Sequence, residues 1–244
     1  MHDDGYFDEP VAARYDETAS ERFQRDEVDP TVDLLEELAA GGRALEFAIG
    51  TGRIGLPLAV RGVEVAGIEL SEAMASRLRT KPGGAEIPVT IGDMADVPVD
   101  GEFALVFIVF NTFFMLTSQE SQLQCFRNVA KHLVPGGRFL MHAFVPDVSR
   151  IEAGSHLGVR EAGLDRVRLD ATTYERIEQR LDATQMRITE QGIRFVHTRL
   201  RYAWPPELDL MAQLAGLTLD ARYATFDKQP FTDESAFHVS VYRA

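Results

Sequence analysis

The sequence has few of the residues that cross-link a chain or carry it into a membrane. Cys125 is the only cysteine among 244 residues, which excludes an intrachain disulfide and a zinc site built from thiolates. The longest apolar run, residues 103–110, is far shorter than the roughly 20 residues that a membrane-spanning helix needs. The first residues do not combine a basic stretch with an apolar one, as a secretory signal does. We therefore expect a cytoplasmic protein with no membrane partner and no metal site.

Positive charge is also scarce. The chain has 25 basic and 38 acidic residues, for a formal net charge of −13. Residues 1–40 hold thirteen of the acids and three of the bases, so the excess is concentrated there. Nucleic acids and anionic membranes attract Lys and Arg, so the charge disfavours both as partners. With 45% hydrophobic residues the chain can bury a large core, and we expect one folded domain over residues 1–244.

Strand and helix patterns alternate between residues 28 and 143. Short apolar runs predict strands, and apolar residues at helical spacing predict the helices between them. The predicted strands are 44–49, 63–69, 87–91, 103–110 and 138–143, and the predicted helices are 28–40, 53–60, 73–79 and 119–133. Pro30 suits the first turn of its helix, and Pro135-Gly136-Gly137 separates the last helix from the last strand. This alternation is typical of a doubly wound α/β sheet.

The pattern changes after about residue 150. Residues 166–204 alternate polar and apolar side chains and are typical of antiparallel strands with one solvated face. We expect strands near 167–170, 175–177, 186–189 and 195–202, within an antiparallel insertion over residues 151–204. Pro205-Pro206 then opens a helix that ends near Ala215, and residues 217–224 and 237–242 read as closing strands. The core fold, built by residues 28–150, thus resumes over residues 205–244.

A glycine-rich turn follows the first strand. Gly50-x-Gly52-x-x-Gly55, with Glu69 about 20 residues on, matches the fingerprint of dinucleotide-binding proteins and leaves an NAD(P)-dependent oxidoreductase open. Glu46 lies inside the strand, four residues before Gly50, and this position favours a different nucleoside. Glycines between a strand and a helix let a ligand approach the backbone and the helix N-terminus.

Three segments, Glu46–Gly55, Gly67–Ser71 and Gly92–Ala95, resemble those of the class I S-adenosylmethionine-dependent methyltransferases. The likeness covers residues 30–145 and implies a Rossmann-like, mostly parallel seven-stranded sheet, with S-adenosyl-L-methionine as cofactor and S-adenosyl-L-homocysteine as product. It places Glu46 near the cofactor's amino group, Glu69 on the ribose hydroxyls, and Asp93 with Met94 on the adenine. The complete set of expected cofactor-binding residues is Glu46, Ala48, Gly50, Gly52, Arg53, Glu69, Leu70, Met74, Asp93, Met94, Phe110 and Asn111.

The chemistry of these residue types agrees with the resemblance. A carboxylate accepts hydrogen bonds from two vicinal hydroxyls, and such charge-assisted bonds are roughly twice as strong as neutral ones. An Asp beside a Met offers the adenine both an acceptor and an apolar contact. Asn111 follows a strand at the edge where such sheets bind ligands, although it suits a capping role equally well, and Phe110 suits the core equally well.

Catalysis by such a protein is an in-line displacement, in which the nucleophile of the acceptor attacks the methyl carbon of a sulfonium. A base is needed only when the nucleophile arrives protonated. His142, near the end of its strand, is the candidate base, and a histidine held within the sheet is the alternative. Tyr15, in an N-terminal segment over residues 1–27 that resembles a lid, is the second candidate catalytic residue. Its alternative is a surface helix.

The acceptor is expected to be a small molecule. Asn111-Thr112-Phe113-Phe114 stands where enzymes that methylate DNA bases have Asn-Pro-Pro-aromatic. The nearest likeness is to small-molecule N- or O-methyltransferases, including those of glycine and aminosugars. A protein that binds S-adenosylmethionine without turning it over is a further alternative. The inserted strands would roof the acceptor pocket or form a homodimer interface.

Overall fold

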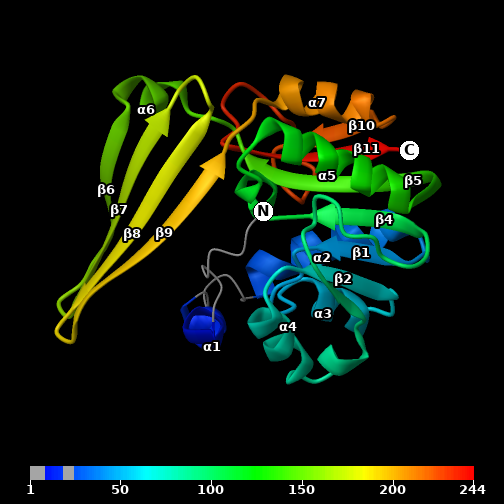
Figure 1. Ribbon diagram of the computed structural model, residues 1–244, viewed down its shortest axis with the longest axis horizontal. Helices are drawn as coiled ribbons and strands as arrows, with labels where there is room; N and C mark the ends of the chain where they lie inside the picture. Colours follow the sequence, from blue (N-terminus) through cyan, green and yellow to red (C-terminus); the bar gives the residue numbers. More distant parts are fainter. Residues whose placement is uncertain (1–8, 19–24) are drawn as a thin grey trace.

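The computed structural model describes residues 9–18 and 25–244, which form two sheets and the helices around them (Figure 1). The helices are α1 (Glu9–Thr18), α2 (Arg25–Ala39), α3 (Gly55–Val60), α4 (Glu72–Arg79), α5 (Gln119–His132), α6 (Val148–Ala153) and α7 (Pro205–Leu214), with short 3-10 turns η2 (Gly84–Glu86) and η3 (Thr112–Met115). The strands are β1 (Ala44–Phe47), β2 (Val65–Glu69), β3 (Val89–Ile91), β4 (Phe103–Ile108), β5 (Leu133–Phe144), β6 (Ser155–Ala162), β7 (Arg166–Glu175), β8 (Arg180–Thr189), β9 (Gly192–Arg201), β10 (Thr218–Tyr223) and β11 (Phe237–Arg243). Within these described ranges, no helix has both the length and the apolar character needed to cross a membrane.

The main sheet has seven strands in the order β10-β11-β5-β4-β1-β2-β3. Its strands from β3 to β5 run parallel, and β11 runs antiparallel to both of its neighbours. The central strand β1 places Glu46 opposite Gly67 of β2 and Phe107 of β4. The predicted fold, a mostly parallel seven-stranded sheet with a separate antiparallel one, is therefore confirmed, and the ends of β1, β2 and β4 meet at one edge.

Helices cover both faces of this sheet, because its central strands β1, β2 and β4 bury side chains on both sides. On one face Phe126 of α5 packs edge-on against Phe139 and Tyr242, with α7 beside it. On the other face Val32 and Leu35 of α2 and Leu58 of α3 are almost fully buried. Two hydrophobic cores, one on each face, hold the β1–α3 turn and the strand ends in place.

Two boundaries in the main sheet and its helices differ by three or more residues from those predicted. The first core helix begins at Arg25, so Pro30 lies inside it rather than in its first turn. A proline removes a single N–H group, and the burial of the helix's apolar side chains outweighs that loss. Strand β5 begins at Leu133 and runs through the Pro-Gly-Gly segment, because Gly136 N–H donates to the Ala244 carbonyl and Ala244 N–H to the Gly137 carbonyl. Pairing with the end of the chain makes this predicted break part of the strand.

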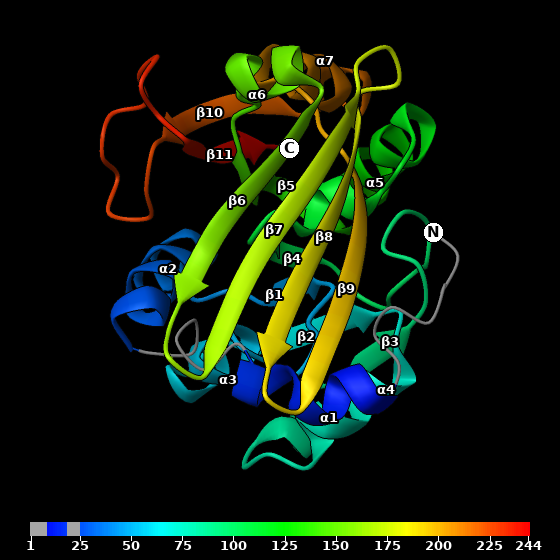
Figure 2. The ribbon, with the colours of Figure 1, turned by 90° about the vertical axis from the view of Figure 1, so that its left-hand side faces the viewer.

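The second sheet is antiparallel, in the order β6-β7-β8-β9, and Figure 2 shows it standing in front of the main sheet. The predicted insertion is present, but its first strand, β6, was not predicted. The strand expected near residues 175–177 was also wrong. There β7 ends at Glu175, which pairs with Arg180, and Ile177 lies in the turn between them with 94% of its surface exposed. Ile177 favours a strand by its residue type, because it is β-branched, although it lies in the turn.

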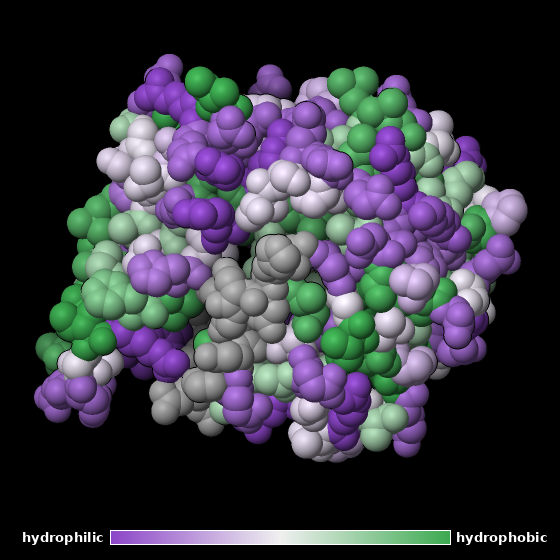
Figure 3. Space-filling model, in the orientation of Figure 1, coloured by the Kyte–Doolittle hydropathy of each residue, from purple (hydrophilic) through white to green (hydrophobic). Residues whose placement is uncertain are grey.

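The faces of the second sheet differ in what they contact. Tyr174, Leu181 and Leu200 lie on one face and pack against the core that also contains α5 and α7. The opposite face carries apolar side chains that are more than half exposed. These are Leu157, Val159, Ile193 and Phe195. Figure 3 shows apolar side chains gathered at the left of the molecule, where Figure 1 places this sheet. We call the face with Tyr174, Leu181 and Leu200 the core-facing side, and the opposite face the outer side.

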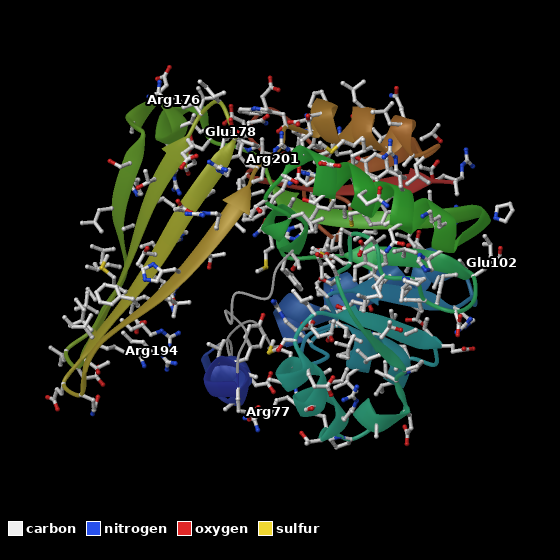
Figure 4. All side chains as sticks on the ribbon, in the orientation of Figure 1. Arg77, Glu102, Arg176, Glu178, Arg194 and Arg201 are labelled. Carbon is white, nitrogen blue, oxygen red and sulfur yellow. The ribbon has the colours of Figure 1, made fainter. Side chains whose placement is uncertain are left out.

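The base of the second sheet is fixed by a buried polar cluster. The guanidinium of Arg201, with 6% of its side chain exposed, forms an ion pair with Glu207 at 2.7 Å. Arg201 also donates to the side-chain oxygens of Gln122 and Gln179, and the Gln122 amide donates to the carbonyl of Arg201 at 2.8 Å. Figure 4 shows Arg201 where β9 reaches the main body. This cluster joins β9 to α5 and α7 and so holds the base of the second sheet against the main body.

Candidate active site

The turn after β1 depends on glycine. Ala48, Gly50 and Gly52 have φ angles of 57°, 58° and 82°, all in the left-handed region. A Cβ at Gly52 would lie 2.4 Å from the Leu78 side chain, so no larger residue fits there without rearrangement. Gly50 and Gly52 themselves carry no side chain that would cover the backbone of this turn, at the edge where β1, β2 and β4 end.

Glu69 ends β2 and fastens the glycine turn. Its carboxylate accepts hydrogen bonds from Gly50 N–H at 2.8 Å and from Ser71 N–H at 2.9 Å, one on each oxygen. The side chain is buried, with 5% of the residue exposed. Because a carboxylate oxygen accepts more than one hydrogen bond, these two bonds leave capacity for a hydroxylated ligand. Glu69 thus has a structural role as well as the predicted one.

Glu46 lies one strand away and is a buried carboxyl group. Burial raises its pKa well above the usual value; the Gly55 N–H bonded to it and the nearby Arg53 lower that pKa, and Glu69 raises it further. Among the described residues Oε2 of Glu46 has no hydrogen-bond partner. Gly55 makes room for it, because a Cβ there would lie 2.7 Å from this oxygen. A buried acceptor oxygen of this kind suits a ligand's ammonium group.

The predicted adenine-binding residues follow β3. Asp93 Oδ1 accepts a hydrogen bond from Ala95 N–H at 2.9 Å, and Gly92 N–H donates to the Glu69 carbonyl at 3.0 Å, so this turn is tied to the end of β2. Met94 is buried in the core at 2% exposure, and the Asn128 amide holds its carbonyl at 3.1 Å. The structure thus brings Asp93 beside Glu69 and leaves little of Met94 at the surface.

Leu70 and Met74 adjoin the same edge. Leu70 is half-buried and follows Glu69 directly. Met74 is buried in the first turn of α4, and its N–H donates to the side chain of Ser71, the N-cap. Its methyl carbon lies 3.5 Å from the position a Cβ would take at Gly50. Met74 therefore closes one side of the glycine turn.

Phe110 and Asn111 end the β4 segment in an unusual conformation. Their φ angles are 59° and 69°, a region that costs free energy for a bulky residue such as Phe. The Arg53 guanidinium carbon lies 3.7 Å from the centre of the Phe110 ring, a cation–π contact. Asn111 Oδ1 accepts a hydrogen bond from Phe144 N–H at 2.7 Å, so Asn111 bridges the ends of β4 and β5. Asn111 is the N-cap residue of η3, but its side chain makes no capping hydrogen bond among the described residues, so its observed role is this bridge rather than the capping role weighed from the sequence.

His142 is held between the sheet and a loop. Its ring lies 4.9 Å from that of Phe226 and stacks on Phe237 at 5.4 Å. Nδ1 accepts a hydrogen bond from Phe110 N–H at 3.1 Å, which places the proton of the neutral ring on Nε2. Burial and, to a smaller extent, the charge of Arg53 lower the pKa of His142 to about 4. This geometry argues against His142 as a base and favours it as a support for Phe110.

Helix α1 is fastened to the glycine turn by Asp16. Thr51 Oγ1 donates to Asp16 Oδ1 at 2.6 Å, and Lys81 Nζ contacts Asp16 Oδ2 at 2.6 Å. Lys81 also donates to the Thr51 carbonyl at 2.7 Å. Sequence analysis singled out Tyr15, which is half-buried on this helix, and missed Lys81, which no motif marks.

Arg77 of α4 makes a second connection to α1. Its guanidinium donates to the carbonyls of Ala12 and Ala13, and Figure 4 shows Arg77 between the two helices. Residues 1–8 and 19–24 of the predicted lid lie outside the described residues. The helix within that segment is therefore in place against the expected cofactor site.

Aromatic rings line the side where the second sheet meets the main body. Phe114 packs edge-on against Phe144 at 4.9 Å, and Tyr174 against Tyr202 at 6.1 Å. Burial raises the pKa of Tyr174. Neither Phe144 nor the two rings around His142 was predicted, because Phe226 lies in a loop and no local pattern sets it apart.

Comparison with known proteins agrees with this geometry. Residues 44–137 match the family described as "Methyltransferase domain". The chain is 39% identical to the CcbJ methyltransferase from Streptomyces caelestis, a solved structure, with a TM-score of 0.83 over 88% of this chain and 94% of that one. It is 26% identical to the cypemycin N-terminal methyltransferase of a Streptomyces species over 91% of this chain and 94% of that protein. It is also 33% identical to a dTDP-4-amino-2,3,4,6-tetradeoxy-D-glucose N,N-dimethyltransferase of Saccharopolyspora spinosa over 38% of this chain and 36% of that one.

Proposed function

Since this chain belongs to the class I S-adenosylmethionine-dependent methyltransferases, we propose that it methylates an amine nitrogen of a small-molecule metabolite. Methyl transfer to nitrogen or oxygen of a small molecule is the activity of the group, and the choice of nitrogen is our inference. The names of two relatives support it, since one is a cypemycin N-terminal methyltransferase and the other is an N,N-dimethyltransferase of a dTDP-linked amino sugar. The buried, unpartnered oxygen of Glu46 is the observation that carries the cofactor assignment.

The residues at the strand ends fit S-adenosylmethionine. Glu46 would accept the ammonium group of its methionine part, and the bare turn of Gly50 and Gly52 would pass beneath that part. Glu69 would accept hydrogen bonds from the ribose hydroxyls while keeping its two hydrogen bonds from backbone N–H groups. Asp93 would accept the adenine amine beside it. Arg53, stacked on Phe110, would face the carboxylate of the cofactor's methionine part.

The bound cofactor supplies a methyl group on a sulfonium, which is already an excellent leaving group. The protein therefore has to orient the acceptor nitrogen and exclude water, effects worth several kcal/mol of barrier. The core-facing side of the second sheet and helix α1 provide walls for this purpose. Tyr15, on that helix, is the proposed contact that closes the site. An amine whose pKa places enough of it in the neutral form needs no protein base, which agrees with the environment of His142.

His142 and Phe110 are proposed to act together as positioning residues. The hydrogen bond from Phe110 N–H to Nδ1 of His142 stabilises the left-handed backbone at Phe110. That backbone directs the Phe110 ring under the Arg53 guanidinium. His142→Asn, which retains an acceptor, should preserve activity better than His142→Leu, and both should lower kcat less than loss of a general base would.

Thermal unfolding with S-adenosylhomocysteine, with NAD and NADP in parallel, tests the cofactor. A ligand at 100 times its Kd that binds only the folded state adds about 2.7 kcal/mol, so the Tm should rise with S-adenosylhomocysteine alone. A rise with the nicotinamides alone would establish the oxidoreductase alternative instead. Methyl transfer to a panel of amines and aminosugars then tests the acceptor class, and binding without any turnover would indicate a non-catalytic protein.

The ribose assignment has its own test. Glu69→Gln keeps an acceptor for one backbone N–H but removes the charge, so we expect S-adenosylhomocysteine to bind about 1–2 kcal/mol more weakly. Glu64→Gln, at an exposed ion pair with Arg43, is the matched control. Unchanged affinity in the Glu69 variant would refute the ribose contact.

A further inference from the structure

Three arginines stand side by side across the second sheet. Arg168 of β7 lies directly opposite Arg187 of β8, and Arg187 directly opposite Arg194 of β9. They share the core-facing side with Tyr174, Leu181 and Leu200, because each is an even number of residues away along its own strand. Figure 4 shows Arg194 extending from β9 toward the side where α1 lies. We call Arg168, Arg187 and Arg194 the arginine row.

The arginine row is costly as it stands. Like charges directly opposite each other on neighbouring strands destabilise a sheet. Burial lowers the pKa of Arg187, and the charges of Arg168 and Arg194 lower it further, whereas Glu161 raises it. Within the described ranges, Nε of Arg168 is buried and has no hydrogen-bond partner.

Two acidic groups beside the row form ion pairs with arginines outside it. Glu161, opposite Arg168 on β6, accepts from Arg166 at 2.5 Å, and Asp170 Oδ2 accepts from Arg160 at 2.5 Å. The other oxygen of Asp170, on the same side of the sheet as the row, is buried and is bonded to none of the described residues. The buried donor Nε of Arg168 and the buried acceptor Oδ1 of Asp170 thus lie two residues apart along β7, on the core-facing side of the sheet. Unsatisfied groups of this kind indicate a polar ligand.

We propose that the arginine row is an oxyanion subsite, which binds a carboxylate or phosphate group of the methyl acceptor. This inference rests on the proposed function and narrows the acceptor to molecules that carry an acidic group. Guanidinium groups bind such oxyanions through paired hydrogen bonds. Leu181, near the base of the sheet, and Arg187 are six residues apart along β8, or about 20 Å. The arginine row therefore lies toward the end of the second sheet that is remote from its base.

Calorimetric titration with pyrophosphate and with citrate, at constant ionic strength and without cofactor, tests the subsite. We expect the wild-type protein to bind at least one of them, and the stronger binding probe distinguishes phosphate from carboxylate. Arg168→Gln and Arg194→Gln should each weaken binding about tenfold, as loss of a charge-assisted hydrogen bond does. Arg199→Gln is the control: it removes the same charge from the outer side, where Arg199 pairs with Asp182 at 2.6 Å, and should leave binding unchanged.

Several results would overturn the subsite. No binding of either probe would refute the subsite, and equal weakening in the Arg199 control would show adventitious binding only. Binding that appears only after Asp3, Asp4 and Asp8 are changed to Asn would show that the row serves the chain's own acidic N-terminus. S-adenosylhomocysteine titrations on the same variants separate the two proposals: its affinity should be unchanged, and failure to bind the wild-type protein would refute the proposed function while leaving the pyrophosphate result intact.

Discussion

Glu46 is an acid whose position is costly before the cofactor binds. It is buried on the central strand, its pKa is raised mainly by burial, and among the described residues its Oε2 has no partner. An ammonium group reverses this situation, because an opposite charge at hydrogen-bonding distance favours the ionised carboxylate. Binding of the cofactor is therefore coupled to the release of a proton.

This coupling predicts a pH dependence of affinity. Since the free protein holds a proton on Glu46 above the usual carboxyl range, the Kd for S-adenosylhomocysteine should fall as pH rises from 5 toward 7, where the ligand's amino group remains protonated. Calorimetry in two buffers of different ionisation enthalpy measures the released proton directly. Glu46→Gln should bind more weakly, by roughly tenfold, and should show neither the pH dependence nor the proton release.

The residues of the site were predictable only where neighbours in sequence act together. Glu46, Gly50 and Gly52 lie within one strand and its turn, and Glu69 ends the next strand, so spacing alone locates them. Lys81 and Phe226 reach the site from segments with no distinctive pattern. The environment of His142 depends on such distant contacts, which is why its low pKa could not be foreseen.

At the scale of elements, helix α1 depends on few side chains for its attachment. Asp16→Asn would weaken the bonds to Thr51 and Lys81, a partly exposed pair worth about 0.5–1 kcal/mol. We expect faster hydrogen exchange and faster proteolysis across residues 9–18, with little change in global Tm. Asp33→Asn, at the exposed pair with Arg61, should leave exchange in α1 unaltered. Equal exchange in both variants would show that Asp16 does not hold α1 in place.

The base of the second sheet depends on a buried ion pair. Arg201→Met would leave Glu207 without its partner in a largely buried site, and removal of one member of such a pair costs about 3–5 kcal/mol. Urea unfolding should show this loss, with partial recovery in Arg201→Met combined with Glu207→Leu. Arg180→Met, at the exposed pair with Glu175, should cost less than 1 kcal/mol. A similar loss in both single variants would contradict the special role of the cluster.

Helices and strands were predicted well where hydrophobic periodicity is strong. They were predicted poorly where hydrogen bonds between strands set the limits of a strand. The apolar strands of the main sheet and the helix at Pro205 follow from local patterns. The extension of β5 through Pro135 and Gly136 depends on hydrogen bonds with Ala244, more than a hundred residues away, and no local pattern contains that information. The same holds for β6, whose partner β7 fixes its limits.

At the scale of the whole molecule, buried histidines should make stability depend on pH. His238 is fully buried, and burial lowers its pKa to about 3. In the unfolded chain a histidine takes up its proton near pH 6.5, so the unfolded state binds more protons below that pH and stability falls as pH is lowered toward 3. At pH 5 the loss is about 2 kcal/mol.

Tm measured between pH 7.5 and 5 tests this expectation. His238→Asn, which keeps a bond to Ser240, should flatten the dependence. His197→Asn, on the outer side of the second sheet, is the control and should keep the wild-type slope. An unchanged slope in the His238 variant would assign the acid sensitivity to other groups. The homodimer expected from the inserted sheet remains a prediction, which light scattering on the purified protein tests.

The insertion point of the second sheet has a consequence for how such enzymes diversify. The chain leaves the main sheet at the end of β5 and returns at the end of β9, and both strands contact η3, so the two junctions lie close together. Residues 146–201 therefore behave as an exchangeable cassette between two fixed junctions. Grafting the corresponding segment of a relative would transplant acceptor choice while the methyl-donor site, built entirely outside the cassette, keeps its affinity.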